Sequence, residues 1–210
     1  MKRSKTWIYF LVPLGVFLAG LLYLWLAGEA DAAAVKENVV RFHVVAASDS
    51  EVDQQLKLTV RNGLFERIEE LFSDCTDQAQ ALQKANANRS VLQAQAEAIL
   101  RAQGAADSVT VEVGERFFPT KSYGALSFPA GRYQAVSVRI GAAEGENFWC
   151  VLYPALCIAP AVESEQAEGE LVAVVGEQGT EFLKKSGETQ RVKFFLVEWF
   201  AKIKEFFANF

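Results

Sequence analysis

The hydrophobic and polar positions divide the chain into four stretches of different character. An uncharged, largely apolar run extends from Trp7 to Ala27. Alternating and helix-spaced apolar residues follow, then a segment rich in glutamate and glycine, and finally an amphipathic end. We therefore expect a signal peptide or N-terminal membrane anchor, a globular domain, an acidic Gly/Glu-rich linker and an amphipathic C-terminal helix, at residues 1–32, 33–162, 163–190 and 191–210 respectively.

The first stretch is typical of an export signal. Lys2, Arg3 and Lys5 precede the apolar run, which as a helix is long enough to cross a bilayer of about 30 Å. A basic flank stays on the cytoplasmic side, so the rest of the chain is expected to be extracytoplasmic. The small residues of Ala30-Asp31-Ala32 fit a signal peptidase site. Cleavage and retention as an anchor therefore both stay open.

The next residues predict a strand followed by helices. Apolar and polar residues alternate over Val39–Ala46, which indicates a half-buried strand. Ser48-Asp49-Ser50 ends it and provides a helix cap, and apolar residues then recur every three or four positions over Glu51–Phe72. A second helical region extends over Thr76–Gln103, with Thr76 as its cap and an expected break at Asn86-Ala87-Asn88.

Further strands complete the expected domain, in the order β-α-α-β-β-β-β. Alternation predicts them at Val109–Val113, Arg132–Ile140 and Phe148–Tyr153, with a turn at Pro129–Gly131. The order of elements indicates an α+β fold with a mostly antiparallel sheet and helices on one face. We expect the signal or transmembrane helix to precede this domain and the amphipathic helix to follow it.

The end of the chain changes from acidic to amphipathic. Glutamates and glycines dominate residues 163–190, where we expect a linker with at most a short strand at Leu171–Val175. On a helical wheel the last twenty residues separate a narrow polar stripe from a broad aromatic face. A membrane interface, a hydrophobic groove of a partner or the protein's own sheet can receive that face. Its membrane-interface candidates are Trp199, Phe200, Ile203, Phe206, Phe207 and Phe210.

Charge and composition exclude some classes of protein. The formal net charge is −5, and an acidic surface repels phosphate backbones, so we expect no nucleic-acid partner. His43, Cys75, Cys150 and Cys157 are of the types that bind zinc, but they lack the short paired spacing of zinc sites. We therefore expect no metal and no cofactor.

Two cysteines lie seven positions apart in a chain that carries an export signal. A bond between Cys150 and Cys157 closes an eight-residue ring, worth roughly 2.5 kcal/mol by the loop-entropy relation. The alternative is a pair of reduced, buried thiols. Cys75 stands alone near a helix end, where it fits a small apolar filler.

The candidate chemistry is that of a binding protein more than of an enzyme. A hydrolase with Cys150 as nucleophile and His43, the only histidine, as base is conceivable from residue types. No nucleophile signature surrounds Cys150, however, so we expect no catalytic residues. Loop aromatics, amides and charges give contact area and directional hydrogen bonds. On this basis the partner-binding candidates are Asp49, Lys121, Tyr123, Asn147 and Trp149. Each alternative is structural: Tyr123 and Trp149 can be core residues, and Lys121 can be solvated. Asp49 can serve as a helix cap.

Several segments between Val39 and Cys157 together resemble a known family. They are Arg41–Ser50 with Asp53–Lys57, Phe118–Gly124, Phe128–Tyr133, Gly145–Cys150 and Pro154–Cys157. In these segments the chain closely resembles stage II sporulation protein R of endospore-forming bacteria. Two positions depart from the usual pattern of that family: His43 stands where an arginine is expected, and Ala47 where an asparagine is expected.

The resemblance implies a signalling function. Such a protein is made in the forespore and exported into the space between forespore and mother cell. There it activates a membrane-embedded aspartic protease, which processes the precursor of a sporulation sigma factor. Two alternatives stay open: an extracytoplasmic cysteine-dependent hydrolase acting on peptide or cell wall, and a structural protein of the septum. The oligomeric state stays open as well.

Overall fold

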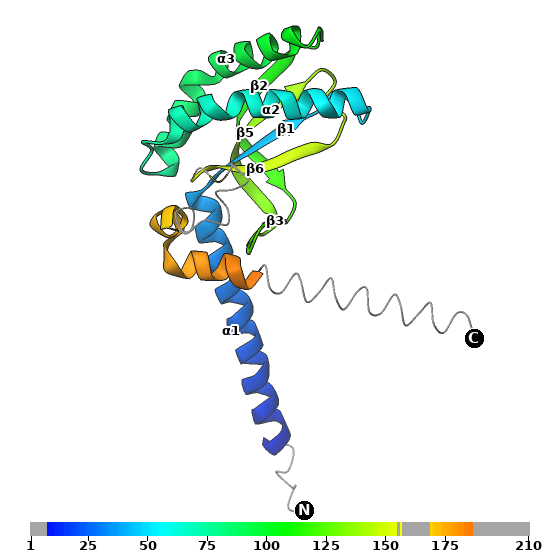
Figure 1. Ribbon diagram of the computed structural model, residues 1–210. Helices are drawn as coiled ribbons and strands as arrows, with labels where there is room; N and C mark the ends of the chain where they lie inside the picture. Colours follow the sequence, from blue (N-terminus) through cyan, green and yellow to red (C-terminus); the bar gives the residue numbers. More distant parts are fainter. Residues whose placement is uncertain (1–7, 155, 157–168, 187–210) are drawn as a thin grey trace, which may run out of the picture.

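The protein folds as a sheet with helices on both sides. The computed structural model describes residues 8–154, residue 156 and residues 169–186. Figure 1 shows helices α2 and α3 on one side of the sheet, and the end of α1 with the helical residues 169–186 on the other. The named elements are α1 (Ile8–Asn38), β1 (Val40–Val45), α2 (Glu51–Phe72), α3 (Gln78–Ala102), β2 (Val109–Phe118), β3 (Lys121–Tyr123), β4 (Leu126–Phe128), β5 (Gly131–Ile140) and β6 (Asn147–Tyr153).

The main sheet is mixed, with strand order β2-β5-β1-β6. Strand β5 pairs antiparallel with β2, and β6 antiparallel with β1, but β1 and β5 are parallel. The α+β class is confirmed, whereas the expectation of a mostly antiparallel sheet holds only in part. Helices α2 and α3 and strand β2 lie between β1 and β5 in sequence, a connection long enough for parallel pairing. Strands β3 and β4 form a separate hairpin.

Strand β1 is central, and the prediction of a half-buried strand was wrong. All six of its residues are buried. Val40, Phe42 and Val44 belong to the core beneath the helices, while the alternate positions Arg41 and His43 lie on the opposite face. That opposite face is covered by a second apolar layer near Arg41. A central strand with apolar layers against both faces is buried on both sides, even where its sequence alternates between apolar and polar residues.

The helix boundaries follow from their caps. Helix α2 has the predicted bounds, and the Ser50 side chain accepts a hydrogen bond from the Asp53 main-chain N–H at 3.2 Å. For α3 the predicted cap was wrong: Asp77, not Thr76, accepts from the main chain of Gln80. Aspartate is the better acceptor for this position, because it presents a carboxylate to the positive end of the helix.

The expected break in the second helical region does not occur. Helix α3 continues through Asn86 and Asn88. Their side-chain amides donate to the carbonyl oxygens of Leu82 and Lys84, at 3.0 and 2.9 Å. These bonds tie each side chain to a carbonyl oxygen one turn earlier, and the helix continues through both residues.

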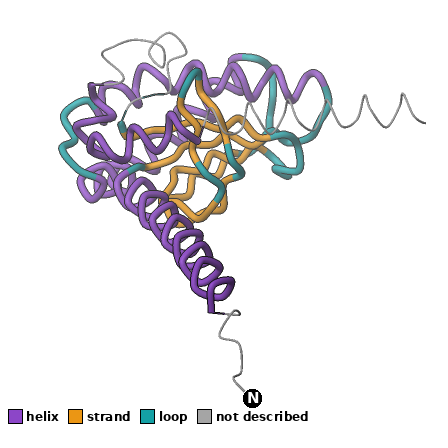
Figure 2. The backbone as a smooth tube through the Cα atoms, turned by 90° about the horizontal axis from the view of Figure 1, so that it is seen from below, coloured by secondary structure: helices purple, strands orange, loops and turns teal. Residues whose placement is uncertain are grey.

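The main core lies between the sheet and helices α2 and α3. The two helices approach closely at Gly63, where an added Cβ would lie only 2.6 Å from Cδ1 of Ile99. Figure 2, seen from below, shows α1 leading away from the strands. Buried residues of this core include Val60, Leu64, Ile68, Leu92, Ala96, Leu100, Val111, Val138 and Leu152.

A second, smaller core covers part of the opposite face. Val35 of α1 packs there with Phe118, Phe128 and Tyr133 and with two leucines of the later helical segment, Leu171 and Leu183. The short strand expected at Leu171–Val175 was wrong, because residues 169–186 are helical, with a left-handed backbone at Gly176 (φ +75°). Because Leu171 and Leu183 are buried in the second core, the segment packs against the domain. Its acidic composition did not indicate this packing.

The predicted leader corresponds to the first part of α1. Within the part of the chain that the structure describes, no helix meets the length and hydropathy expected of a membrane span. Trp7 and the side chains of residues 8–10, 21 and 24–28 lie outside that part. The predicted helix at 191–210, with its membrane-interface candidates, also lies outside the described residues.

Candidate functional site

The segments singled out in the sequence converge along β1 and β6. At one end, the guanidinium of Arg41 is enclosed by aromatic rings and is fully buried. Its Cζ lies 4.6 Å from the ring centroid of Phe118, 5.1 Å from Phe128 and from Tyr133, and 5.8 Å from Tyr123. Such distances permit cation–π attraction, which is strongest where water is excluded.

Hydrogen bonds fix the Arg41 side chain inside this cage. Nε donates to the Cys150 carbonyl oxygen at 2.9 Å, and Nη2 donates to the Tyr123 hydroxyl at 3.0 Å. The third nitrogen, Nη1, has no hydrogen-bond partner among the described residues. Because Tyr123 and Phe128 belong to the β3–β4 hairpin, Arg41 fastens that hairpin to the main sheet. The partner-binding candidate Tyr123 is thus a half-buried structural contact of Arg41.

Tyr133 closes the cage from β5. Its hydroxyl donates to the Pro129 carbonyl oxygen at 2.7 Å. Burial raises the pKa of Tyr133 to about 12, although the nearby charge of Arg41 acts in the opposite direction. The phenol therefore stays neutral and donates a hydrogen bond throughout the physiological range.

The middle of the site is a stack of His43 on Trp149. Their ring centroids are 5.2 Å apart and the planes differ by 5°. The edge of Phe118 contacts both rings, at 5.4 and 4.9 Å, and Nδ1 of His43 lies 3.2 Å from Oδ1 of Asn147. Asn147 and Trp149, both partner-binding candidates, are therefore neighbours on one face, and each is partly exposed.

The protonation state of His43 follows from its surroundings. Burial lowers the pKa of His43 below its ordinary value of 6.5. The hydrogen bond with Asn147 opposes this shift, and the charges of nearby arginines reinforce it. The imidazole is therefore neutral at pH 7. Because the Asn147 oxygen can only accept, Nδ1 carries the proton and Nε2 is left as an acceptor.

A transverse row of side chains crosses the sheet at this point. Pairing places Glu112 opposite Ser137, Ser137 opposite His43, and His43 opposite Trp149. Directly opposed residues share a face of a sheet, so all four lie on the face away from α2 and α3. Glu112 accepts from Nη2 of Arg116 at 2.5 Å, and this hydrogen bond lowers the pKa of its carboxyl group.

The loop before β6 forms the other end of the site. Oδ1 of Asp49 accepts from the Glu146 main-chain N–H at 2.7 Å, and Nζ of Lys57 donates to the Glu146 carbonyl oxygen at 3.1 Å. At Gly145 an added Cβ would lie 2.2 Å from the Ser48 carbonyl oxygen, so only glycine fits. Two motifs almost a hundred residues apart are thereby locked together, and Asp49 serves as a clamp at the start of α2.

Cys150 and His43 lie on opposite faces of the sheet, so these two residues do not form a catalytic pair. Cys150 pairs across the strands with Phe42 and is buried in the core beneath the helices, whereas His43 faces the other side. Within the described residues Cys150 has a free thiol. Cys157 lies outside them, so the disulfide between Cys150 and Cys157 stays a prediction.

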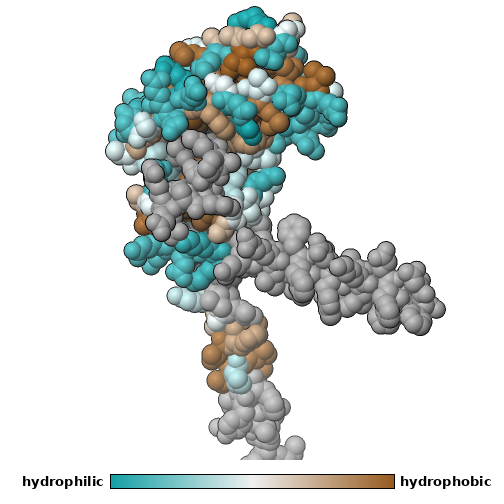
Figure 3. All heavy atoms as spheres, in the orientation of Figure 1, coloured by the Kyte–Doolittle hydropathy of each residue, from teal (hydrophilic) through white to brown (hydrophobic). Residues whose placement is uncertain are grey.

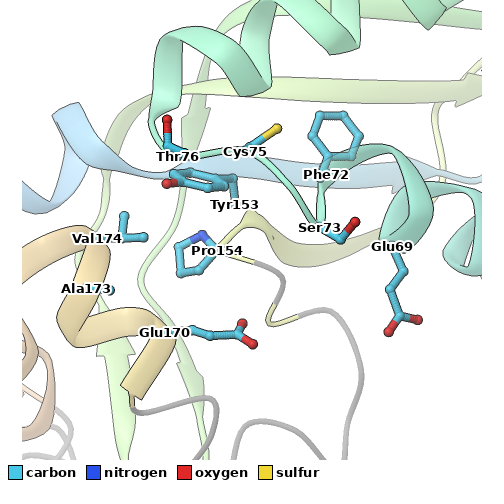
Figure 4. A pocket seen from close by; sticks show the side chains of 10 residues that line it. All are labelled: Glu69, Phe72, Ser73, Cys75, Thr76, Tyr153, Pro154, Glu170, Ala173 and Val174. Atoms are coloured by element: carbon cyan, nitrogen blue, oxygen red, sulfur yellow. The ribbon is translucent and has the colours of Figure 1, made fainter.

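A pocket of about 340 Å³ lies where the end of β6 meets the helical segment 169–186. Figure 4 shows Cys75, Tyr153 and Glu170 among the side chains around it. Burial raises the pKa of Cys75, so its thiol is protonated and a poor nucleophile. Among the described residues no group of acidic, histidine and cysteine side chains is arranged to hold a metal ion.

Sequence reasoning missed two residues of this site. Arg41 and Ser137 were not candidates, and Lys121 proves to be a partly exposed strand residue opposite Phe128, at the base of the hairpin. The missed signal was a charged residue between Val40 and Phe42. A charge at an alternating position of an apolar strand either faces solvent or is satisfied inside, and the sequence does not distinguish the two.

Comparison with known proteins gives the class of this chain. Residues 36–163 match the family model of stage II sporulation protein R, and this range includes the residues from Arg41 to Trp149 described above. The chain belongs to this family of sporulation signalling proteins. It is similar to the stage II sporulation protein R of Bacillus subtilis (strain 168), with 29% identity over 191 residues, 83% of this chain and 85% of the relative. No solved structure matches the chain significantly.

Proposed function

We propose that this protein is an exported signal that activates a membrane-embedded aspartic protease, which then processes the precursor of a sporulation sigma factor. Membership of the sporulation family supports the signalling part. The protease and the sigma-factor precursor come from what the family resemblance implies. In this account the protein binds its partner and performs no covalent chemistry.

The first part of α1 supports export. Its side chains between Leu11 and Tyr23 include many large apolar groups with half or more of their area exposed, up to 68% for Val16 and 72% for Tyr23. Figure 3 shows this hydrophobic surface on the part of α1 that projects from the domain. Exposed apolar surface of this kind is unfavourable in water and suits a lipid environment or a secretion channel. The segment acts as a signal peptide or as an anchor.

The observation that supports the binding role best is the position of the family segments. Arg41, His43, Asn147 and Trp149 lie on one continuous sheet face, where their buried groups hold a rigid surface in place. The residue that a cysteine hydrolase needs, Cys150, lies in the core on the other face. A rigid surface can shift a partner between inactive and active states through differential affinity.

The predicted C-terminal helix adds a second proposal. If residues 191–210 lie at a membrane surface, they raise the local concentration of the domain near its partner. Removal of residues 192–210 should then weaken signalling at low expression and spare it at high expression. Equal loss at every expression level would count against tethering.

The test is processing of the sigma-factor precursor in a heterologous cell that carries the aspartic protease. We expect precursor cleavage when the exported chain is present and none in its absence. The variant Cys150→Ser separates the alternatives, because a nucleophile cannot be replaced by serine without a large loss of rate. Retained processing by exported, folded Cys150→Ser excludes the hydrolase. No difference between cells with and without the chain would refute the activating role.

A further inference from the structure

The pocket at the end of β6 has apolar walls from three separate parts of the chain. Phe72 of α2, Pro154 after β6 and Val174 of the helical segment 169–186 line its volume of about 340 Å³. Phe72 is 3% exposed, and Val174 packs against the main core. This volume is at the lower end of the range for ligand pockets, so the pocket is suited to a single long side chain.

Tyr153 contributes a polar group to the interior of the pocket. The residue is 5% exposed, and Figure 4 shows it at the pocket above Pro154. Its hydroxyl makes no hydrogen bond in the described part of the chain, but unlike the enclosed Nε2 of His43 and Oγ of Ser137 it opens into a pocket. A buried hydroxyl without a partner is unfavourable. A ligand with a hydrogen-bonding group would relieve this cost.

Two carboxylates add negative charge at the rim. Glu69, near the end of α2, and Glu170, at the start of the helical segment, line the pocket and are exposed. Neither makes an ion pair with another described residue. Figure 4 shows both of them on the side of the pocket away from Cys75 and Thr76. The pocket therefore combines apolar walls, one free hydroxyl and two unpaired carboxylates.

Lysine and arginine side chains match all three features. Their methylene stems pack against apolar surface while the charged head reaches polar groups. An ammonium or guanidinium group donates hydrogen bonds to hydroxyl and carboxylate oxygens, and it is attracted to the face of an aromatic ring. A purely apolar ligand would leave the hydroxyl and the carboxylates without partners, and an acidic ligand would be repelled.

We propose that this pocket receives a lysine or arginine side chain from the extracytoplasmic part of the partner protease. The stem of that side chain lies against the apolar walls, and its charged head bonds to Tyr153 and pairs with Glu69 and Glu170. The contact rests on the proposed function, since it names part of the surface by which the protein reaches its partner. A basic side chain anchored in such a pocket contributes specificity as well as affinity.

The first pair of variants tests the charge. Glu69→Gln with Glu170→Gln removes both rim carboxylates, and Glu66→Gln with Glu177→Gln makes the same change at exposed positions of the same two segments outside the pocket. In the heterologous reporter cell with the full exported chain, we expect the pocket variant to lower precursor processing about tenfold. The matched variant should stay within about twofold of wild type.

The variant Tyr153→Phe tests the free hydroxyl. The ring stays and no hydrogen bond within the described residues is lost, so thermal stability should be unchanged or higher. Processing should nevertheless fall by about threefold or more, because a hydrogen bond to the partner is lost. Lower stability with full processing would show that another segment of this chain fills the pocket. That result would overturn the proposal.

A double-mutant cycle locates the partner side chain. Each lysine and arginine in the extracytoplasmic part of the protease is changed to alanine, and processing is measured with the wild-type chain and with the pocket variant. One change should lower processing by the wild-type chain and cause little further loss with the pocket variant, because both remove the same contact. Additive effects for every basic residue of the protease would contradict the proposal.

The outcomes separate this inference from the proposed function. If the wild-type chain does not stimulate processing, the proposed function fails and the pocket contact falls with it. If wild type stimulates processing but the pocket variant and its matched control behave alike, only the pocket contact is wrong.

Discussion

The Arg41 guanidinium donates to the Tyr123 hydroxyl at 3.0 Å across 82 residues of sequence. This bond joins the fully buried Arg41 of the central strand to the half-buried Tyr123 of the β3–β4 hairpin. Aromatic rings take the position of a counterion, and the guanidinium nitrogens are only partly satisfied by the described residues. The position of the hairpin against the main sheet thereby depends on a polar contact as well as on apolar burial.

Removing the Tyr123 hydroxyl should weaken the domain measurably. In Tyr123→Phe the ring stays, and one charge-assisted hydrogen bond of Arg41 is lost, at a cost of about 1–3 kcal/mol. Urea unfolding of the exported chain measures the change. The matched variant Tyr23→Phe, on the exposed part of α1, should have no effect. Equal stability of the two variants would show that the bond contributes nothing.

A methyl group at position 145 should disturb the loop before β6. Gly145→Ala places a Cβ against the Ser48 carbonyl oxygen, and relief requires a backbone shift that costs about 1–3 kcal/mol. Gly114→Ala is the matched control, since no atom lies within 4 Å of its added Cβ. Thermal unfolding compares the two. A smaller loss for Gly145→Ala than for Gly114→Ala would contradict the close approach.

The main effect of replacing Asp49 should be a loss of stability, and any effect on binding should follow from that loss. Asp49→Ala removes the acceptor for the Glu146 main-chain N–H, with an expected loss of about 1–2 kcal/mol in unfolding free energy. Asp53→Ala is a useful comparison, because Asp53 accepts from the Ser48 hydroxyl within the same turn. Full stability of Asp49→Ala together with lost signalling would restore Asp49 as a direct partner contact.

His43 should make the fold sensitive to mild acid. Its pKa is lowered in the folded state, mainly by burial, so the unfolded state binds more protons as the pH falls below about 6.5. The stabilising contribution is therefore present above that value and is lost toward lower pH. Unfolding free energy measured at several values between pH 7.5 and 5 should fall for wild type, as a direct consequence of linkage.

The variant His43→Phe should remove this slope, because His43 is the only histidine of the chain. The titration of Glu112 does not interfere with the comparison of wild type and His43→Phe. The hydrogen bond from Arg116 lowers its pKa below the ordinary 4.5, so it titrates under more acidic conditions. A wild-type stability that stays flat over the same interval would contradict a buried, neutral imidazole.

Local patterns predicted the elements of the fold better than their arrangement. The cap at Ser50 and the apolar spacing that follows determine α2 from residues within a few positions of one another. Strand positions for β1, β5 and β6 also follow from alternation. Parallel pairing of β1 with β5 does not, because it depends on how the intervening helices cross the sheet. The docking of residues 169–186 likewise depends on Leu171 and Leu183 reaching a distant apolar layer.

The candidate site shows the same division. Asn147 and Trp149 were identified because loop aromatics and amides are suited to contacts, and they prove to be neighbours. Arg41 and Ser137 were not identified from the sequence, because their roles depend on the residues that surround them in the folded protein. Three strands must be in register before Ser137 meets His43 and His43 meets Trp149. No local spacing encodes that row.

Export is the central requirement of the proposed signal, and it can be tested with one paired measurement. Leu14→Arg with Leu18→Arg places two charges in the apolar part of α1, at side chains that are 51% and 55% exposed, so the folded domain is not disturbed. In the reporter cell, wild type should drive precursor processing, and the double variant should accumulate inside the cell without processing. Processing at the wild-type level by the retained variant would contradict an extracytoplasmic signal.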